Sequence, residues 1–337
     1  MVGAFLNFSI NDRETVTMAG DFSSMDRRTF LAGVSATALA PGLAHARSAD
    51  LGYVDAHSHL WSPERTLYPL RDGAKEDSVK PKGFTAGEFF SHARREGVTR
   101  MVVVGHTGHF GYDARYLIDI ARARPGEIAI QAFLDHADAG VVARMAELKA
   151  QGVKAFRLRL LDPFQGAFPD SHPIFKVYEF AARERLVICP LTNPDWLPEL
   201  GRLSARHPAT VVAIDHFARI GVDGFGKVPA VPGTIKEEDV ANLVRLAEHP
   251  MMHVKLSAFY ALGNRTAPYD DMIPFIRKLL DAYGPQRLMW GSDCPYQLGS
   301  GHTYQASIGL IRDRLDGVSE EGREWLLRKT AERVFFS

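Results

Sequence analysis

Two histidines separated by one residue, His57 and His59, stand at the end of the first apolar run beyond residue 50. If this run is a β-strand, both side chains project to one side, because alternate residues of a strand point the same way. Two imidazoles on one side of a strand can hold a metal ion, polarise a substrate group or transfer protons. A lone His-x-His pair is a weak signal, so its meaning depends on what other segments bring to it.

Two further residues with suitable chemistry, His216 and Asp293, directly follow later apolar runs. Taken singly, the first could be a buried histidine with a satisfied ring and the second a turn residue. Taken together with the histidine pair, they suit a bound Zn²⁺ or a similar ion. They suit acid–base catalysis without a metal equally well. The sequence predicts a catalytic centre that holds one divalent metal ion, with zinc the best match, or none. Its predicted members are His57, His59, His216 and Asp293.

The elements that would position these residues alternate regularly along the chain. Beyond residue 50, short β-rich apolar runs are separated by stretches with the 3.6-residue period of helices. Strands are predicted at 52–56, 101–105, 128–133, 153–158, 186–191, 210–214, 251–256 and 287–291. Helices are predicted at 85–96, 114–124, 139–151, 174–185, 195–206, 237–248 and 272–283, followed by a closing pair at 303–315 and 319–335.

Eight strands, each followed by a helix, are typical of a (β/α)₈ barrel. The alternative is an open doubly wound sheet, which usually has a glycine-rich turn after its first strand. This chain has the histidine pair at that place. We therefore predict an α/β protein with a single-domain, distorted (β/α)₈ TIM barrel over residues 50–337. The predicted centre falls at the carboxyl ends of the strands, where barrel active sites lie.

Residues 1–46 are predicted to be an N-terminal extension with an export signal, outside the barrel. The basic pair Arg27 and Arg28, the apolar run 31–43 and the small residues that follow are typical of a signal peptide. The basic pair also resembles a twin-arginine signal. We expect cleavage near Ala46 and a periplasmic or secreted protein. A buried helix that opens the domain is the alternative, which the polar residues directly after the run disfavour.

The charge balance limits the partners. The 40 basic and 40 acidic residues cancel, so the chain lacks the positive excess that nucleic acids or anionic membranes attract. The apolar run near the N-terminus is too short to span a bilayer. We expect a small-molecule substrate, while the sequence leaves the oligomeric state open.

Two arginines on the predicted fourth strand, Arg157 and Arg159, point the same way and suit carboxylate binding. They predict an acidic or polyhydroxylated substrate, unless they pair with acids inside the barrel. Lys255 ends the seventh strand and is either a substrate contact or a structural ion-pair partner. The remaining predicted substrate-binding residues are His106, Trp61 and Tyr296.

Several motifs spread along the chain carry a family resemblance. They are Asp55-x-His57-x-His59-x-Trp61, Tyr68-Pro69, Ile214-Asp215-His216, Lys255-Leu256-Ser257 and Trp290-Gly291-Ser292-Asp293-x-Pro295. These motifs resemble the amidohydrolase superfamily, and within it the lactonase-like amidohydrolase 2 branch, which includes sugar lactonases and 2-pyrone-4,6-dicarboxylate lactonase. The resemblance implies a distorted barrel and attack of water on a carbonyl. It implies that Asp293 takes the proton from water while the histidines surround the carbonyl or a metal.

Two departures from this family pattern concern the metal. Many members carry a bridging Lys or Glu on strand 4, whereas this strand ends with Arg157 and Arg159. Metal-binding members often have a histidine at the end of strand 5, which is missing here. His106 or His136 could substitute, although neither matches a family position. The resemblance therefore implies one metal ion or none.

Three classes of function remain open from the sequence. The first is a hydrolase of lactones or esters. The second is a metal-dependent decarboxylase of an aromatic or enoic acid on the same barrel. The third is a binding protein on a decayed barrel, which the intact set of three histidines and one aspartate disfavours.

Overall fold

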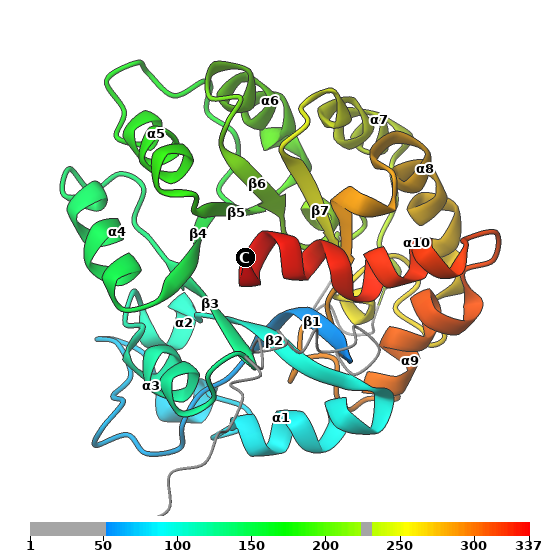
Figure 1. Cartoon of the computed structure of the whole chain (residues 1–337), viewed down its shortest axis with the longest axis horizontal. Helices are drawn as coiled ribbons and strands as arrows, with labels where there is room; N and C mark the ends of the chain where they lie inside the picture. Colours follow the sequence, from blue (N-terminus) through cyan, green and yellow to red (C-terminus); the bar gives the residue numbers. More distant parts are fainter. Residues whose placement is uncertain (1–51, 224–230) are drawn as a thin grey trace, which may run out of the picture. The chain divides into compact units, whose positions relative to one another are not determined.

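The computed structural model describes residues 52–223 and 231–337. The predicted export signal, residues 1–46, lies outside the described residues. The described part forms one sheet of eight parallel strands that follow one another in chain order, with helices around it (Figure 1). The strands are β1 (Tyr53–His59), β2 (Val98–Val104), β3 (Ile128–Phe133), β4 (Val153–Leu160), β5 (Val187–Thr192), β6 (Val211–Ile214), β7 (Met252–Leu256) and β8 (Leu288–Trp290). The predicted (β/α)₈ barrel is confirmed.

The helices cover the outside of the barrel, and their bounds lie close to the predicted ones. They are α1 (Ala86–Ala93), α2 (Thr107–Phe110), α3 (Arg115–Ala123), α4 (Val141–Ala150), α5 (Ile174–Glu184), α6 (Leu197–Arg206), α7 (Glu237–Arg245), α8 (Ile273–Tyr283), α9 (Tyr304–Gly309) and α10 (Glu320–Glu324). The short α2 was not predicted. The two closing helices continue as π-helical turns, Leu310–Arg314 after α9, and Trp325–Lys329 and Glu332–Phe336 after α10. Among the described residues, no helix combines the length and apolarity needed to cross a bilayer.

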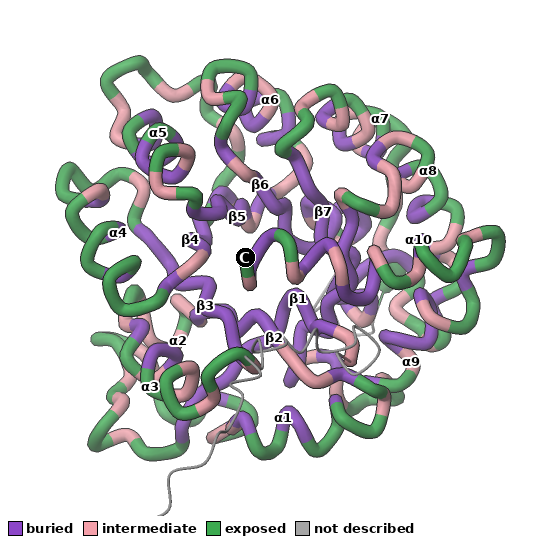
Figure 2. The backbone as a smooth tube through the Cα atoms, in the orientation of Figure 1, coloured by how far each residue is buried: buried purple, intermediate pink, exposed green. Residues whose placement is uncertain are grey.

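The core is divided between the outside and the inside of the barrel. The larger apolar cluster packs the strands against the surrounding helices. A smaller one fills the barrel with small and branched side chains and is closed by Val334 and Phe335 of the last helical segment, which crosses the barrel opening in Figure 1. Figure 2 shows the resulting burial: the strands are buried, while the outer sides of the helices are exposed. Apolar packing therefore plugs one end of the barrel and leaves the other for chemistry.

Strand β1 and the segment after β8 close the barrel through their main chains. The amide of Asp293 donates to the carbonyl of His57 (2.8 Å), and the amide of His59 donates to the carbonyl of Cys294 (2.7 Å). Gly291 permits this approach, since a Cβ atom there would lie 2.8 Å from His57 Cβ. The closure brings the first and last predicted site motifs side by side.

The carboxylate of Asp55 reinforces this closure from within. Its Oδ1 accepts the main-chain amides of His57 (3.1 Å) and Ser292 (2.9 Å). Its Oδ2 accepts the hydroxyls of Ser58 (3.0 Å) and Tyr304 (2.9 Å). A buried carboxyl with four donors has its acceptor capacity filled, so Asp55 holds the two segments together and offers nothing to a ligand.

Replacing His253 of β7 by Gln is expected to make stability less sensitive to acid. This buried ring donates to the carbonyl of Met251 (3.0 Å), and burial lowers its pKa to about 4. Since the unfolded histidine titrates near pH 6.5, the neutral folded form loses stability as the pH falls from about 6.5 towards 4, by about 2 kcal/mol at pH 5. Thermal unfolding at pH 8 and pH 5 measures this loss. The exposed His92→Gln should keep the wild-type slope, and an unchanged slope in His253→Gln would contradict the assignment.

Candidate functional site

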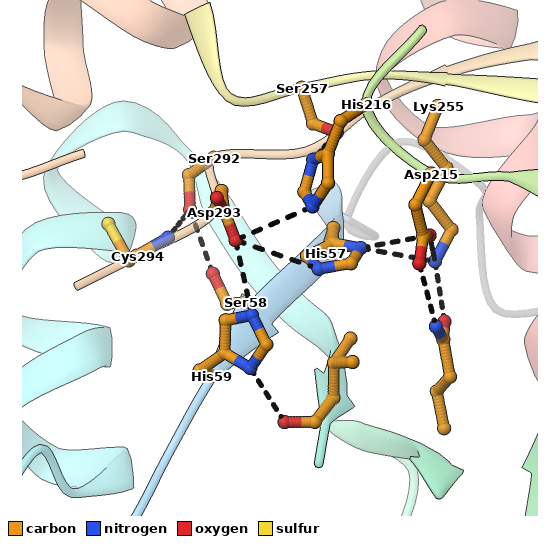
Figure 3. A network of polar contacts seen from close by, with 12 residues as sticks. His57, Ser58, His59, Asp215, His216, Lys255, Ser257, Ser292, Asp293 and Cys294 are labelled. Carbon is orange, nitrogen blue, oxygen red and sulfur yellow. Dashed lines mark hydrogen bonds and ion pairs between the residues drawn. The ribbon is translucent and has the colours of Figure 1, made fainter. Parts of the chain in front are cut away.

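The four residues predicted from the sequence meet at one point (Figure 3). Asp293 Oδ1 lies 3.2 Å from His59 Nε2, 3.6 Å from His57 Nε2 and 3.9 Å from His216 Nε2. All four residues are buried. One carboxylate oxygen therefore faces three imidazole nitrogens, which the carboxyl ends of β1, β6 and β8 bring together.

His216 is positioned by an unusual turn after β6. The residues of His216–Arg219 have φ angles of 52°, 54°, 56° and 59°, so the segment is one left-handed turn without glycine. Each such residue costs roughly 1–2 kcal/mol, and strain of this kind gathers at functional sites. Phe217 is buried against Phe259 and Phe275 and anchors the turn in the core. The turn directs both of its end residues, His216 and Arg219, to the same cavity.

Asp293 presents one carboxylate oxygen to the histidines and the other to Tyr260. Its backbone is left-handed, with φ at 62°, a conformation that Asp tolerates better than most residues. The Tyr260 hydroxyl donates to Oδ2 at 2.7 Å. Burial alone would raise the pKa of the Asp293 carboxyl, but attraction to His216 and the other imidazoles in their protonated forms holds that pKa below its ordinary value. Asp293 is therefore an ionised carboxylate whose free oxygen points into the centre.

The hydrogen bonds of the ring nitrogens assign the tautomers of two histidines. His59 Nδ1 donates to the carbonyl of Val104 (3.0 Å). His57 Nδ1 faces the carboxylate of Asp215 (3.2 Å) and the ammonium of Lys255 (3.4 Å), and the shorter contact with the acceptor assigns the ring proton to Nδ1. Both Nε2 atoms then carry a lone pair. His57 Nε2 and Asp293 Oδ1 are buried without a hydrogen-bond partner in the described part of the chain. Three acceptors that face one another require a proton or a cation between them, so this centre suits a divalent metal ion.

His216 is held differently from the other two histidines. Arg157 Nη2 lies 3.1 Å from His216 Nε2, and because a guanidinium only donates, Nε2 must accept. The ring proton is then on Nδ1 and points to Ser257 Oγ at 2.9 Å. Burial lowers the pKa of His216 to about 4, so the ring is neutral at pH 7. By distance, one atom each of His57, His216 and Asp293 lie within 4.8 Å of one another and form a possible ligand set.

On the side of His57 away from Asp293 lies a buried charge network centred on Asp215 (Figure 3). Asp215 Oδ1 lies 3.1 Å from Lys255 Nζ, and Oδ2 accepts from Arg157 Nε (2.7 Å) and Gln131 Nε2 (3.3 Å). Burial alone would raise the pKa of this carboxyl, but Lys255 and Arg157 hold it well below its usual value. Asp215 thus orients His57 and balances two buried cations. Its place in the Ile214-Asp215-His216 motif predicts no role by itself, although an acid that follows a buried strand must be paired.

The structure places Lys255 within this network, in agreement with the ion-pair alternative. Its Nζ donates to Gln131 Oε1 (2.5 Å) and pairs with Asp215, and its side chain is fully buried. Lys255 does not line the cavity beside the centre. Lys255 therefore neutralises Asp215 within the buried network. Its position does not support the predicted contact with substrate.

Trp61 also lies one layer behind the cavity. Its Nε1 donates to the carbonyl of Pro81 (2.9 Å), and its ring is packed against those of His106 and Tyr296. Those two rings line the cavity themselves. Trp61 therefore supports the wall that they form.

The cavity at the centre has a volume of about 420 Å³, within the range of small-molecule sites. Arg157, Arg159 and Arg219 line it, and Asp293 is the one carboxylate that does so among the described residues. Arg219, which is not among the residues predicted from the sequence, donates to Asn193 Oδ1 (3.0 Å). The cavity is therefore positively charged around a single ionised acid. Its predicted lining residues are His59, His106, Arg157, Arg159, His216, Asp293 and Tyr296.

A larger cavity, of about 830 Å³, lies at the opposite end of the barrel and contains none of the predicted residues. Two of its arginines, Arg287 and Arg333, already donate to main-chain carbonyls. Size alone does not select the functional site here, because the converging acceptors lie in the smaller cavity.

Comparison with known proteins identifies the family to which the chain belongs. The amidohydrolase family model matches residues 54–336. The chain is 29% identical over 262 residues to an L-fucono-1,5-lactonase of Burkholderia ambifaria, covering 74% of this chain and 82% of that protein. It is 26% identical over 257 residues to a 4-sulfomuconolactone hydrolase of Rhizobium radiobacter, covering 74% of this chain and 80% of that protein.

A solved structure agrees in fold. The crystal structure of an amidohydrolase from Burkholderia multivorans with bound zinc aligns with a TM-score of 0.67 at 23% identity, over 84% of this chain and 98% of that one. The family match spans the barrel from β1 to the last helical segment and includes the four residues of the centre. The chain belongs to the amidohydrolase family.

Proposed function

We propose that this protein hydrolyses a lactone that carries acidic or hydroxyl groups. The observation that carries the proposal is the ionised Asp293, whose free oxygen faces three imidazoles at a cavity lined by arginines. The two curated relatives are both named as lactone hydrolases, which supports the same reaction.

The geometry supplies each part of a hydrolysis. Asp293 accepts a proton from water as the water oxygen bonds to the lactone carbonyl carbon. The Arg157 guanidinium, which lines the cavity, stabilises the negative charge that develops on the carbonyl oxygen. The ring C–O bond then breaks, and the proton held by Asp293 passes to the leaving oxygen. Atoms balance, since one water and one lactone give one hydroxy acid.

A divalent metal ion, with zinc the first candidate, is part of the proposal. His57, His59 and Asp293 would hold it, because the two Nε2 atoms lie 3.6 Å and 3.2 Å from Asp293 Oδ1. By distance His216 also forms a possible ligand set with His57 and Asp293, but Arg157 already donates to its Nε2 atom. Such an ion would act as a Lewis acid towards the substrate carbonyl. The zinc in the Burkholderia multivorans amidohydrolase supports this choice.

The arginines point to the substrate class. Arg157, Arg159 and Arg219 line one cavity. Arg159 and Arg219 can donate paired hydrogen bonds to a carboxylate or sulfonate, whereas the Arg157 fork is already engaged by Asp215 and His216. The Arg159 side chain is about half exposed, and its contact with Asp162 is long at 3.5 Å, so this arginine is available to a ligand. An anionic or polyhydroxylated ring matches such a wall better than an unsubstituted one.

A lactone panel in a pH-indicator assay tests the proposed function. Acid release should be at least about ten-fold faster for carboxylated or polyhydroxylated lactones than for unsubstituted δ-valerolactone, since the added groups contact the arginines. Elemental analysis and activity after chelation test the metal separately. Release of CO₂ from a supplied aromatic acid, with no lactone opened, would replace this proposal with a decarboxylase. Full activity of metal-free protein would reject the zinc part alone.

A further inference from the structure

We infer that Arg157 competes with a divalent metal ion for His216, so that this centre offers an incoming ion three open ligands in place of four. The inference deepens the proposed function, because it rests on the metal site proposed there. It concerns how tightly that site holds an ion and which residue sets the affinity.

The first observation is the way the guanidinium bridges two acceptors. Arg157 Nε donates to Asp215 Oδ2 at 2.7 Å, while Nη2 donates to His216 Nε2 at 3.1 Å. An imidazole nitrogen has one lone pair in the ring plane, and a metal ligand must give that pair to the ion. The hydrogen bond from Arg157 occupies it.

The second observation is that Arg157 is firmly held. It lies within strand β4, its side chain is buried, and its guanidinium stacks over the Phe133 ring at 5.2 Å. The fully buried Asp215 accepts from Nε of the same guanidinium and holds it in place. Moving the guanidinium away from His216 would strain or break a buried ion pair.

The third observation is the contrast with the other two histidines. Val104 and Asp215 take the Nδ1 protons of His59 and His57, which leaves each Nε2 as an acceptor. No arginine or lysine donates to either Nε2 atom in the described part of the chain. An incoming ion finds these two nitrogens and Asp293 Oδ1 open, but at His216 it meets a positive charge already in place.

The positive charge at this centre is therefore divided between Arg157 and the metal ion. The guanidinium supplies at His216 the positive charge that a fourth metal bond would otherwise place there. The ion is therefore bound less tightly than a set of three histidines and one aspartate would allow, and removing Arg157 should strengthen its binding.

Zinc binding to the metal-free full chain, measured by calorimetry at one pH without substrate, tests this inference. Arg157→Met should lower the zinc Kd at least ten-fold. The matched control Arg159→Met removes an arginine from the same cavity whose guanidinium contacts Asp162 rather than an imidazole, and its Kd should stay within three-fold of wild type. A zinc Kd for Arg157→Met equal to that of wild type would overturn the inference.

A double-mutant cycle separates the contact from general charge repulsion. His216→Ala should change the zinc Kd less than three-fold in the wild-type background, since His216 is already engaged. In the Arg157→Met background, the same substitution should raise the Kd at least ten-fold. Equal effects of His216→Ala in both backgrounds would show that Arg157 acts by charge alone, and the inference would fail.

A second variant covers the case in which Arg157→Met does not fold. Arg157→Lys keeps a cation beside Asp215, but a single ammonium lacks the planar fork that bridges two acceptors. The zinc Kd of Arg157→Lys should also be lower than that of wild type, and an unchanged Kd would overturn the inference. Because no substrate is present, these results stand whether or not the protein proves to be a lactonase.

Discussion

Asp293→Asn is expected to lower kcat for lactone opening by about 10²–10⁴-fold, the range over which a positioned general base contributes. Asparagine has nearly the same shape and tolerates the left-handed backbone at this position. Its amide oxygen can still accept the hydroxyl of Tyr260. An amide cannot take a proton from water, so the chemistry is removed while the geometry is kept.

Tyr260→Phe is the matched comparison for this loss. It removes the donor to Asp293 Oδ2 and leaves the carboxylate and its free oxygen in place. We expect a decrease in kcat of less than about ten-fold, in line with the loss of one supporting hydrogen bond. Initial rates at saturating substrate measure both variants, with thermal unfolding as the check on folding. If Asp293→Asn retained activity within ten-fold of wild type, another group would have to be the base.

The centre could be predicted because it depends on strand ends alone. In a parallel barrel all strands end on one face, so identifying the strands that precede His57, His216 and Asp293 is enough to gather these residues. The apolar runs and the helical period predicted those strands to within a few residues. No knowledge of side-chain packing was needed for this step.

The supporting residues could not be predicted in the same way. Gln131 of β3 and Asp215, which directly follows β6, meet across the barrel. Which side chains meet inside a barrel depends on strand register and tilt. Arg219 reaches the cavity through four consecutive left-handed residues, a conformation that no residue preference in His216–Arg219 indicates. The role of Lys255 stayed undecided for the same reason, because a strand position does not tell whether a long side chain points to the ligand or below it.

Asp215→Asn is expected to destabilise the protein by about 3–5 kcal/mol, the usual cost of removing one partner from a buried ion pair. One oxygen of the carboxylate pairs with Arg157, and the other pairs with Lys255. An amide offers one oxygen and turns an NH₂ donor towards the second cation. One buried positive charge is thus left without a partner in a region that water does not reach.

Urea unfolding compared with a surface control measures this effect. Asp270→Asn removes a carboxylate that pairs with Arg314 where both side chains are nearly half exposed, and pairs of this kind contribute about 0–1 kcal/mol. The free energy of unfolding should therefore fall much further for Asp215→Asn. If the two variants lost the same amount, the buried charge network centred on Asp215 would not stabilise the fold.

A double variant identifies the unpaired charge as the cause. Asp215→Asn combined with Lys255→Met removes the cation together with its partner, and replacing both members of a buried pair costs less than breaking it. The double variant should therefore be more stable than Asp215→Asn alone, although it has lost one more native interaction with Gln131. Additive losses would instead mean that Lys255 stabilises the barrel through packing, for example against the Phe335 ring at 5.0 Å, independently of Asp215.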